Sequence, residues 1–355
     1  MDKRWFQLGE LLVNYSARVR PGERVMIAMG EVESFPLVQA VYSAVIRAGG
    51  FPQVQFLSET LRHSLLQDGN EQQITWVPEI EAYGMEWADV YFGLRGAYDL
   101  DIHQAIATAR LSLNQAAAGK VSTLRWQKTR WCLVRVPNPA FARQAGVQED
   151  TLLDMFFKAC LLDWDEMNQK WGSWAERLNR GSQVHLVGKE TDLRFSTRGR
   201  TWMVGDGRNN MPDGEINTAP VENSVEGTMY FEFPGVLSGR LVHDIRLRWE
   251  RGTLVEATSS TNQDFLRSIL ATDPNASRIG EFALGTNPFI NLFCKDILID
   301  EKIGGTVHIA LGRAYPESGG TNQSAIHWDI IKDTRSEGAV TVDDQLVLHN
   351  GQFLF

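Results

Sequence analysis

The chain has 355 residues, of which 43% are hydrophobic and 22% are charged, a composition typical of a soluble globular protein with room for two domains. Its formal net charge of −9 argues against a general nucleic-acid binder, because contact with phosphate depends on clustered lysine and arginine. The three cysteines are scattered, which argues against a disulfide framework, and no uncharged apolar run is long enough to span a bilayer. With no leader-like apolar region near the N-terminus, these features predict a cytoplasmic protein with no membrane partner.

The first half of the chain has the pattern of alternating helices and strands. Apolar residues recur at helical spacing at 5–15 and 37–48, and a further helical stretch is expected around 101–117. Strands are expected at 24–29, 52–57, 88–93 and 130–136. This alternation predicts an α/β N-terminal domain with a mostly parallel sheet. The turn at 30–34 lacks the glycine fingerprints of nucleotide-binding loops and carries two glutamates, so we expect no nucleotide cofactor there.

The pattern changes near residue 180. Residues 149–180 are expected to be helical, whereas short alternating segments at 184–187, 192–197 and 201–204 predict antiparallel strands joined by glycine-containing turns. We therefore expect an N-terminal α/β domain at 1–180 and an α+β, β-rich domain at 181–355. The polar clusters of interest all lie in the second domain.

Two histidines occupy segments with the alternation of a β-strand. His308 alternates with Val307 and Ile309, and His327 shares a face with Asp329 while Trp328 points the opposite way. An apolar face buried in a core would hold the imidazoles and the carboxylate rigidly, as metal ligands require. From this pattern alone, hydrogen-bonded core histidines are the more common outcome.

Two Gly-Glu pairs supply further carboxylates, Gly214-Glu215 and Gly280-Glu281. A glycine before a carboxylate lets the backbone pack closely beside whatever the carboxylate binds. Each pair also fits an ordinary surface turn, and the residues by themselves favour that interpretation.

Longer blocks of sequence are more specific than these short motifs. In the second half these are 210–215, 218–227, 280–287, 300–312 and 324–329, and in the first half 19–25 and 36–49. Together, and in this order, they resemble the signature blocks of the thermophilic metalloaminopeptidase family, the aminopeptidase T and aminopeptidase S type.

The resemblance implies a metal-dependent aminopeptidase that removes the N-terminal residue of short peptides through a metal-activated bridging water. It implies a homodimer and a dinuclear catalytic domain in which two divalent ions are bound by Glu215, Glu281, His308, His327 and Asp329. Three carboxylates and two imidazoles suit Zn, Co or Mn better than Ca.

The resemblance also assigns catalytic roles. It makes Tyr315 catalytic, which we interpret as hydrogen-bond donation to the tetrahedral oxyanion, and Glu281, besides being a ligand, could bridge the metals and shuttle a proton. The general base is left open between Glu281 and Glu222, although Glu222 is better explained as a flanking solvated residue.

Two alternatives remain. Some ring-cleaving dioxygenases acting on dihydroxypyridines resemble this family and hold one Fe(II) with two histidines and a carboxylate, a triad that His308, His327 and Asp329 could form. Those relatives replace the second Gly-Glu carboxylate with histidine, so Glu281 favours the peptidase. A non-catalytic binding protein on an old enzyme fold is the other alternative, and the full set of matching positions argues against it.

Overall fold

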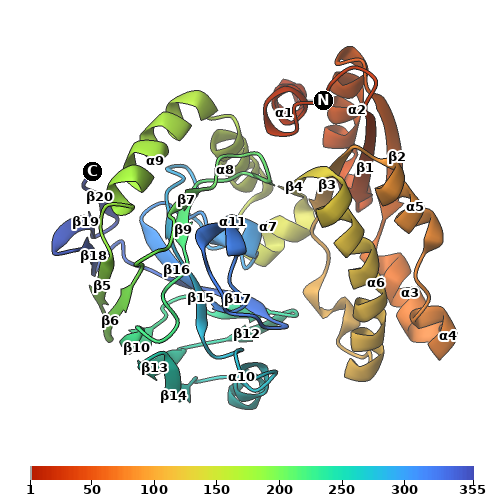
Figure 1. Ribbon diagram of the computed structural model, residues 1–355. Helices are drawn as coiled ribbons and strands as arrows, with labels where there is room; N and C mark the ends of the chain where they lie inside the picture. Colours follow the sequence, from red (N-terminus) through yellow and green to blue (C-terminus); the bar gives the residue numbers. More distant parts are fainter. Residues whose placement is uncertain (1) are drawn as a thin grey trace. The chain divides into compact units, whose positions relative to one another are not determined.

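The structure, a computed structural model, describes residues 2–355, which divide into two compact units (Figure 1). The first unit comprises the chain up to Leu161 together with residues 207–212, and the second comprises residues 162–206 and 213–355. The division into domains at 1–180 and 181–355 that was expected from the sequence stays a prediction.

The first unit is built on a parallel sheet of five strands in the order β2-β1-β3-β4-β8. The strands are β1 (Arg24–Gly30), β2 (Phe51–Leu57), β3 (Val90–Gly96), β4 (Arg130–Val136) and β8 (Asn210–Met211). The helical segments are α1 (Lys3–Leu11), η1 (Leu12–Ser16), η2 (Val32–Ser34), α2 (Phe35–Arg47), α3 (Glu59–Asp68), α4 (Glu71–Ile74), α5 (Glu79–Trp87), η3 (Leu100–His103), α6 (Thr108–Lys128), α7 (Pro139–Ala145) and α8 (Glu149–Cys160).

This architecture confirms the predicted α/β fold with a mostly parallel sheet. Central strands of such a sheet are covered on both faces, so they are apolar throughout rather than alternating. Val25 and Ile27 of β1 and Val90 and Phe92 of β3 are accordingly all fully buried.

Two helical predictions differ in detail from the structure. The helix expected at 101–117 begins only at Thr108 and continues to Lys128, with η3 as a separate short turn before it. The helical region expected at 149–180 consists of two helices, α8 and α9 (Trp164–Leu178). The first helix ends at Cys160, and the Asp163 side chain caps the second by accepting a hydrogen bond from the Glu166 N–H. Among residues 2–355, none of the helices combines the length and apolar character needed to cross a membrane.

The second unit holds two antiparallel sheets, one of eight strands in the order β14-β13-β10-β6-β5-β18-β19-β20 and one of five in the order β17-β16-β15-β9-β7. The strands are β5 (Gln183–Gly188), β6 (Thr191–Ser196), β7 (Met203–Val204), β9 (Glu215–Thr218), β10 (Glu226–Tyr230), β13 (Arg246–Glu250), β14 (Thr253–Thr258), β15 (Ile279–Gly285), β16 (Thr306–Gly312), β17 (His327–Lys332), β18 (Gly338–Val342), β19 (Gln345–His349) and β20 (Gln352–Phe353). A separate hairpin pairs β11 (Gly235–Leu237) with β12 (Arg240–Val242), and the remaining helical segments are α10 (Gln263–Leu270), α11 (Ile297–Asp300) and η4 (Pro316–Ser318). The β-rich second half is therefore as predicted.

The five-stranded sheet has one strongly apolar face. Val307, Ile309 and Leu311 of β16 are fully buried, and Phe282 of β15 packs against Phe195 of β6 with ring centroids 4.9 Å apart. This face anchors β15, β16 and β17 in the core of the unit. The opposite face is left for polar groups.

Candidate metal centre

Strand register brings the predicted polar residues onto the opposite face of the five-stranded sheet. In an antiparallel sheet, directly opposed residues share a face. Ala310 of β16 lies opposite both Glu281 of β15 and Asp329 of β17, and Gly312 lies opposite His327. His308 lies opposite Ala283 of β15, and the other neighbour of β15 is β9, which begins at Glu215. The small side chains of Ala283 and Ala310 leave room among the larger polar groups.

Both Gly-Glu pairs depend on their glycine. Gly280 is the extra residue of a β-bulge, so Ile279 pairs with Leu311 of the apolar face while Glu281 pairs with Ala310 of the polar face. A Cβ on Gly280 would lie 2.3 Å from the carbonyl oxygen of Gly312. Gly214 has a φ of 123°, a conformation that favours glycine. The surface-turn interpretation is wrong for both pairs, because Glu215 and Glu281 are buried and lie in strands.

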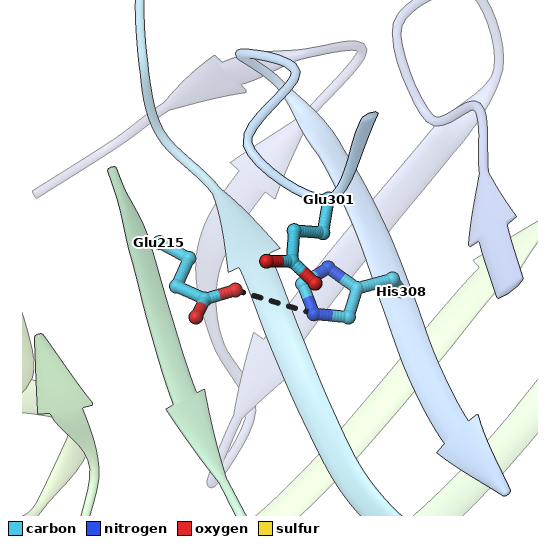
Figure 2. Close-up of side chains that lie close together, drawn as sticks. All are labelled: Glu215, Glu301 and His308. Atoms are coloured by element: carbon cyan, nitrogen blue, oxygen red, sulfur yellow. Dashed lines mark ion pairs between the residues drawn. The ribbon is translucent and has the colours of Figure 1, made fainter. Parts of the chain in front are cut away.

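One group of potential ligands is formed by Glu215, Glu301 and His308, whose ligand atoms all lie within 4.8 Å of one another. Figure 2 shows the two carboxylates and the imidazole turned toward a common point. The Nε2 of His308 lies 3.3 Å from Oε2 of Glu215. Neither of these two atoms, nor Nδ1 of His308, has a hydrogen-bond partner in the described part of the chain, although all three are buried.

A second group is formed by Glu281, His327 and Asp329. The Nε2 of His327 lies 3.3 Å from Oε2 of Glu281 and 3.4 Å from Oδ1 of Asp329. On the other side of the ring, Nδ1 of His327 lies 2.7 Å from the backbone oxygen of Arg313. Because a carbonyl oxygen only accepts, Nδ1 must donate, and the lone pair of a neutral His327 is then at Nε2, facing the carboxylates.

The ionisable side chains of the first group, together with Lys302, shift one another's pKa values. Burial raises the pKa of the Glu215 carboxyl, but the positive charges of Lys302 and His308 outweigh burial and lower this pKa to about 2. For Glu301, burial outweighs the opposing charge of Lys302 and raises the pKa to about 8. Burial lowers the pKa of His308, yet its contact with Glu215 brings that pKa up to about 9. A divalent cation would be the largest local charge here and would favour ionised carboxylates and a neutral imidazole.

Tyr315 lies beside the second group. Its ring packs against that of His327 with centroids 4.9 Å apart. Burial raises the pKa of the Tyr315 phenol well above its usual value, and the negative charges of Glu281 and Asp329 act in the same direction. The phenol therefore keeps its proton and remains a hydrogen-bond donor.

Glu222, the other residue considered as a base, is held by a separate network. Its carboxylate lies 2.6 Å from Nη2 of Arg200 and accepts from both the backbone N–H and the hydroxyl of Thr321. Glu222 is thus half-buried and paired, and it belongs to neither ligand group.

Glu301 is the residue that the sequence did not single out. It follows α11 directly and lies in a turn, where no strand or helix periodicity marks it. Its side chain is nevertheless only 13% exposed and completes the group with Glu215 and His308. The one available signal was its position in the block 300–312, seven residues before His308.

Comparison with known proteins shows the family to which the chain belongs. Residues 1–353 match the model of the family described as thermophilic metalloprotease (M29). The chain is 24% identical to aminopeptidase 2 of Geobacillus stearothermophilus, over 93% of this chain and 92% of that protein. The solved structure of wild-type AmpT from Thermus thermophilus superposes with a TM-score of 0.89 at 25% identity, covering 99% of both chains.

A 2,5-dihydroxypyridine dioxygenase from Pseudomonas putida KT2440 also has a similar structure, with a TM-score of 0.60 at 16% identity over 99% of this chain and 96% of that one. At this identity the likeness shows the fold alone. The buried sheet face carries carboxylates and imidazoles, donor types that suit divalent transition-metal ions. The chain belongs to the thermophilic metalloprotease family M29, and it is a metal-dependent peptide hydrolase.

Proposed function

We propose that the protein is an aminopeptidase that removes the N-terminal residue of short peptides, with two divalent ions held at the candidate metal centre. Glu215, Glu301 and His308 would hold one ion, and Glu281, His327 and Asp329 the other. The observation that carries the proposal is the pair of three-residue groups on one sheet face of a chain from this family. Glu301 joins the five ligands expected from the sequence.

The donor atoms fit a transition-metal ion. Bonds of about 2.1 Å at tetrahedral angles place neighbouring ligand atoms about 3.4 Å apart. His308 to Glu215, His327 to Glu281 and His327 to Asp329 are separated by 3.3, 3.3 and 3.4 Å respectively. The buried, unpartnered atoms of Glu215, His308 and Asp329 lack protein hydrogen bonds within residues 2–355, as ligand atoms often do without their ion. Mixed oxygen and nitrogen donors suit Zn, Co or Mn.

Ions bound there would supply a nucleophilic hydroxide at neutral pH and polarise the scissile carbonyl. Glu281, whose carboxylate lies within the second group, would accept the proton of the attacking water and return it to the leaving amine. Tyr315, whose ring packs against His327, would donate to the oxyanion that develops on the substrate carbonyl. Arg313 holds His327 in the required tautomer through its backbone oxygen.

Metal analysis combined with a panel of aminoacyl chromogenic substrates tests the proposal. We expect two ions per chain after loading with Zn, Co or Mn, hydrolysis of substrates with a free α-amine, and no hydrolysis of their N-acetylated counterparts. A single Fe(II) with oxygen uptake would instead favour the dioxygenase. Absence of hydrolysis in a fully metal-loaded protein would favour the non-catalytic alternative.

Tyr315→Phe is expected to keep both ions but to lower turnover by roughly 10²–10³, because one donor to the oxyanion is lost. Steady-state kinetics with metal content measured on the same sample check this. The packing of the ring against His327 is retained in the variant, so a purely structural role would leave turnover unchanged.

The family resemblance implies a homodimer, the sequence features favour a cytoplasmic protein, and both stay predictions. Light scattering coupled to size-exclusion chromatography would measure the first, and cell fractionation the second. Short peptides with a free N-terminus remain the proposed substrates, and the net charge of −9 gives no reason to expect nucleic acid as a partner.

A further inference from the structure

Lys302 is a fully buried lysine whose ammonium contacts three carboxylates. Its Nζ lies 3.0 Å from Oε1 of Glu215, 2.5 Å from Oε1 of Glu301 and 3.6 Å from Oδ1 of Asp213. The distances to Glu215 and Glu301 allow hydrogen bonds from the ammonium, whereas Asp213 at 3.6 Å is an ion-pair contact only. Two of them, Glu215 and Glu301, belong to the first ligand group.

The two carboxylate oxygens of Glu215 have different neighbours. Oε1 faces Lys302 and also lies 3.4 Å from the amide nitrogen of Asn217. Oε2 faces Nε2 of His308 and has no hydrogen bond within the described residues. The carboxylate is therefore fixed by one oxygen while the other points toward the ligand position.

The backbone around Lys302 is itself held in place. The carbonyl oxygen of Lys302 accepts from the N–H of Asn287, and the side-chain amide of Asn287 donates to the carbonyl oxygen of Asp213 at 2.7 Å. The segment that carries Lys302 and Glu301 is thus tied to the segment that carries Asp213 and Glu215. A rigid support of this kind is what orients metal ligands.

We propose that Lys302 is a positioning residue of the candidate metal centre, whose ammonium holds Glu215 and Glu301 so that they meet His308 in ligand geometry. This inference rests on the proposed metal centre. The second group has no equivalent, since the ion pairs of Glu281 and Asp329 within residues 2–355 are with His327 alone. Only the ion of the first group should depend on Lys302.

A simpler role for Lys302 predicts the opposite sign. If the ammonium only neutralised the buried carboxylates, it would repel a divalent ion, and its removal would strengthen metal binding. If it positions the carboxylates, its removal should weaken metal binding, because loss of an outer contact to a ligand typically costs 10–100-fold in affinity. The direction of the change therefore separates the two roles.

The experiment is a titration of metal-stripped protein with Zn²⁺ or Co²⁺, followed by calorimetry and by the visible spectrum of the cobalt form. We expect Lys302→Met to lower the affinity for one of the two ions by roughly 10–100-fold and to leave the other unchanged. The matched control is Lys332→Met. Lys332 is also fully buried, and its ammonium bonds to the backbone oxygen of Tyr230 and to Glu232, away from both ligand groups.

Lys302→Gln separates position from charge and serves if the methionine variant does not fold. Glutamine has no charge but retains two N–H donors, so positioning predicts that its affinity for the first ion lies between those of Lys302→Met and the wild type. With the glutamine variant alone, weaker binding of one ion supports the proposal. Unchanged or tighter binding in either variant would overturn it. Failure of the wild-type protein to bind two ions would instead count against the proposed function.

Discussion

Replacement of Glu281 by alanine is expected to remove one ion per chain and to lower turnover by roughly 10²–10⁴, the usual contribution of a general base, with the ligand loss in addition. Glu281 is buried in the middle of β15 and lies against His327. Its removal leaves the strand hydrogen bonds intact and relieves repulsion among buried carboxylates, so the fold should survive. Metal content, steady-state kinetics and circular dichroism on one preparation measure all three effects.

The control variant for Glu281→Ala is Glu222→Gln. Glutamine can still accept from Thr321, and Glu222 belongs to neither ligand group, so this variant should keep both ions and turn over close to the wild-type rate. If Glu222→Gln were as inactive as Glu281→Ala while keeping both ions, the general base would be Glu222. If Glu281→Ala kept both ions and full activity, the proposed centre would be wrong.

Removal of metal by a chelator is expected to abolish hydrolysis and to destabilise the second unit. Two ions, each supplied at about 100 times its dissociation constant, would together contribute about 5 kcal/mol to the free energy of unfolding. At 2–4 °C per kcal/mol for a unit of this size, the melting temperature of the metal-free protein should fall by about 10–20 °C. Differential scanning calorimetry before and after chelation measures the shift.

The control for this experiment is restoration by each metal separately. Zn, Co or Mn should recover both the melting temperature and hydrolysis, whereas Ca should recover neither, because imidazole ligands do not suit it. A metal-free protein that melts at the same temperature and remains active would contradict the proposed centre. Recovery of stability without activity would point to a structural rather than catalytic metal.

The parts of the centre that could be predicted from the sequence are those with strand periodicity or a block resemblance. His308, His327 and Asp329 alternate with buried apolar residues, so their shared face follows from the two-residue repeat of a strand. Glu281 could not be placed from its pattern, because the bulge at Gly280 interrupts the alternation and a glycine there suggests a turn. The resemblance, and not the residue pattern, identified it.

Glu301 and Lys302 were missed for a different reason. They lie between α11 and β16, in a turn without periodicity, and their role depends on contacts with Asp213 and Glu215 almost ninety positions earlier. The helical prediction at 101–117 was misplaced because α6 is rich in alanine and polar residues and lacks a clear apolar stripe, which is the signal used to find its limits.

The bulge in β15 has a consequence for how this chain can change over evolutionary time. Because Gly280 is an extra residue in β15, its loss would leave Ile279 opposite Leu311 and Glu281 opposite Ala310 in a regular register. Gain of one residue between Glu281 and Phe282, by contrast, would turn the carboxylate toward the apolar face while the rest of the strand still paired. Changes of length are better tolerated in connecting stretches such as the one between Tyr315 and His327. Variation in loop length, and hence in the walls around the substrate, can accumulate there without disturbing the ligands on the sheet.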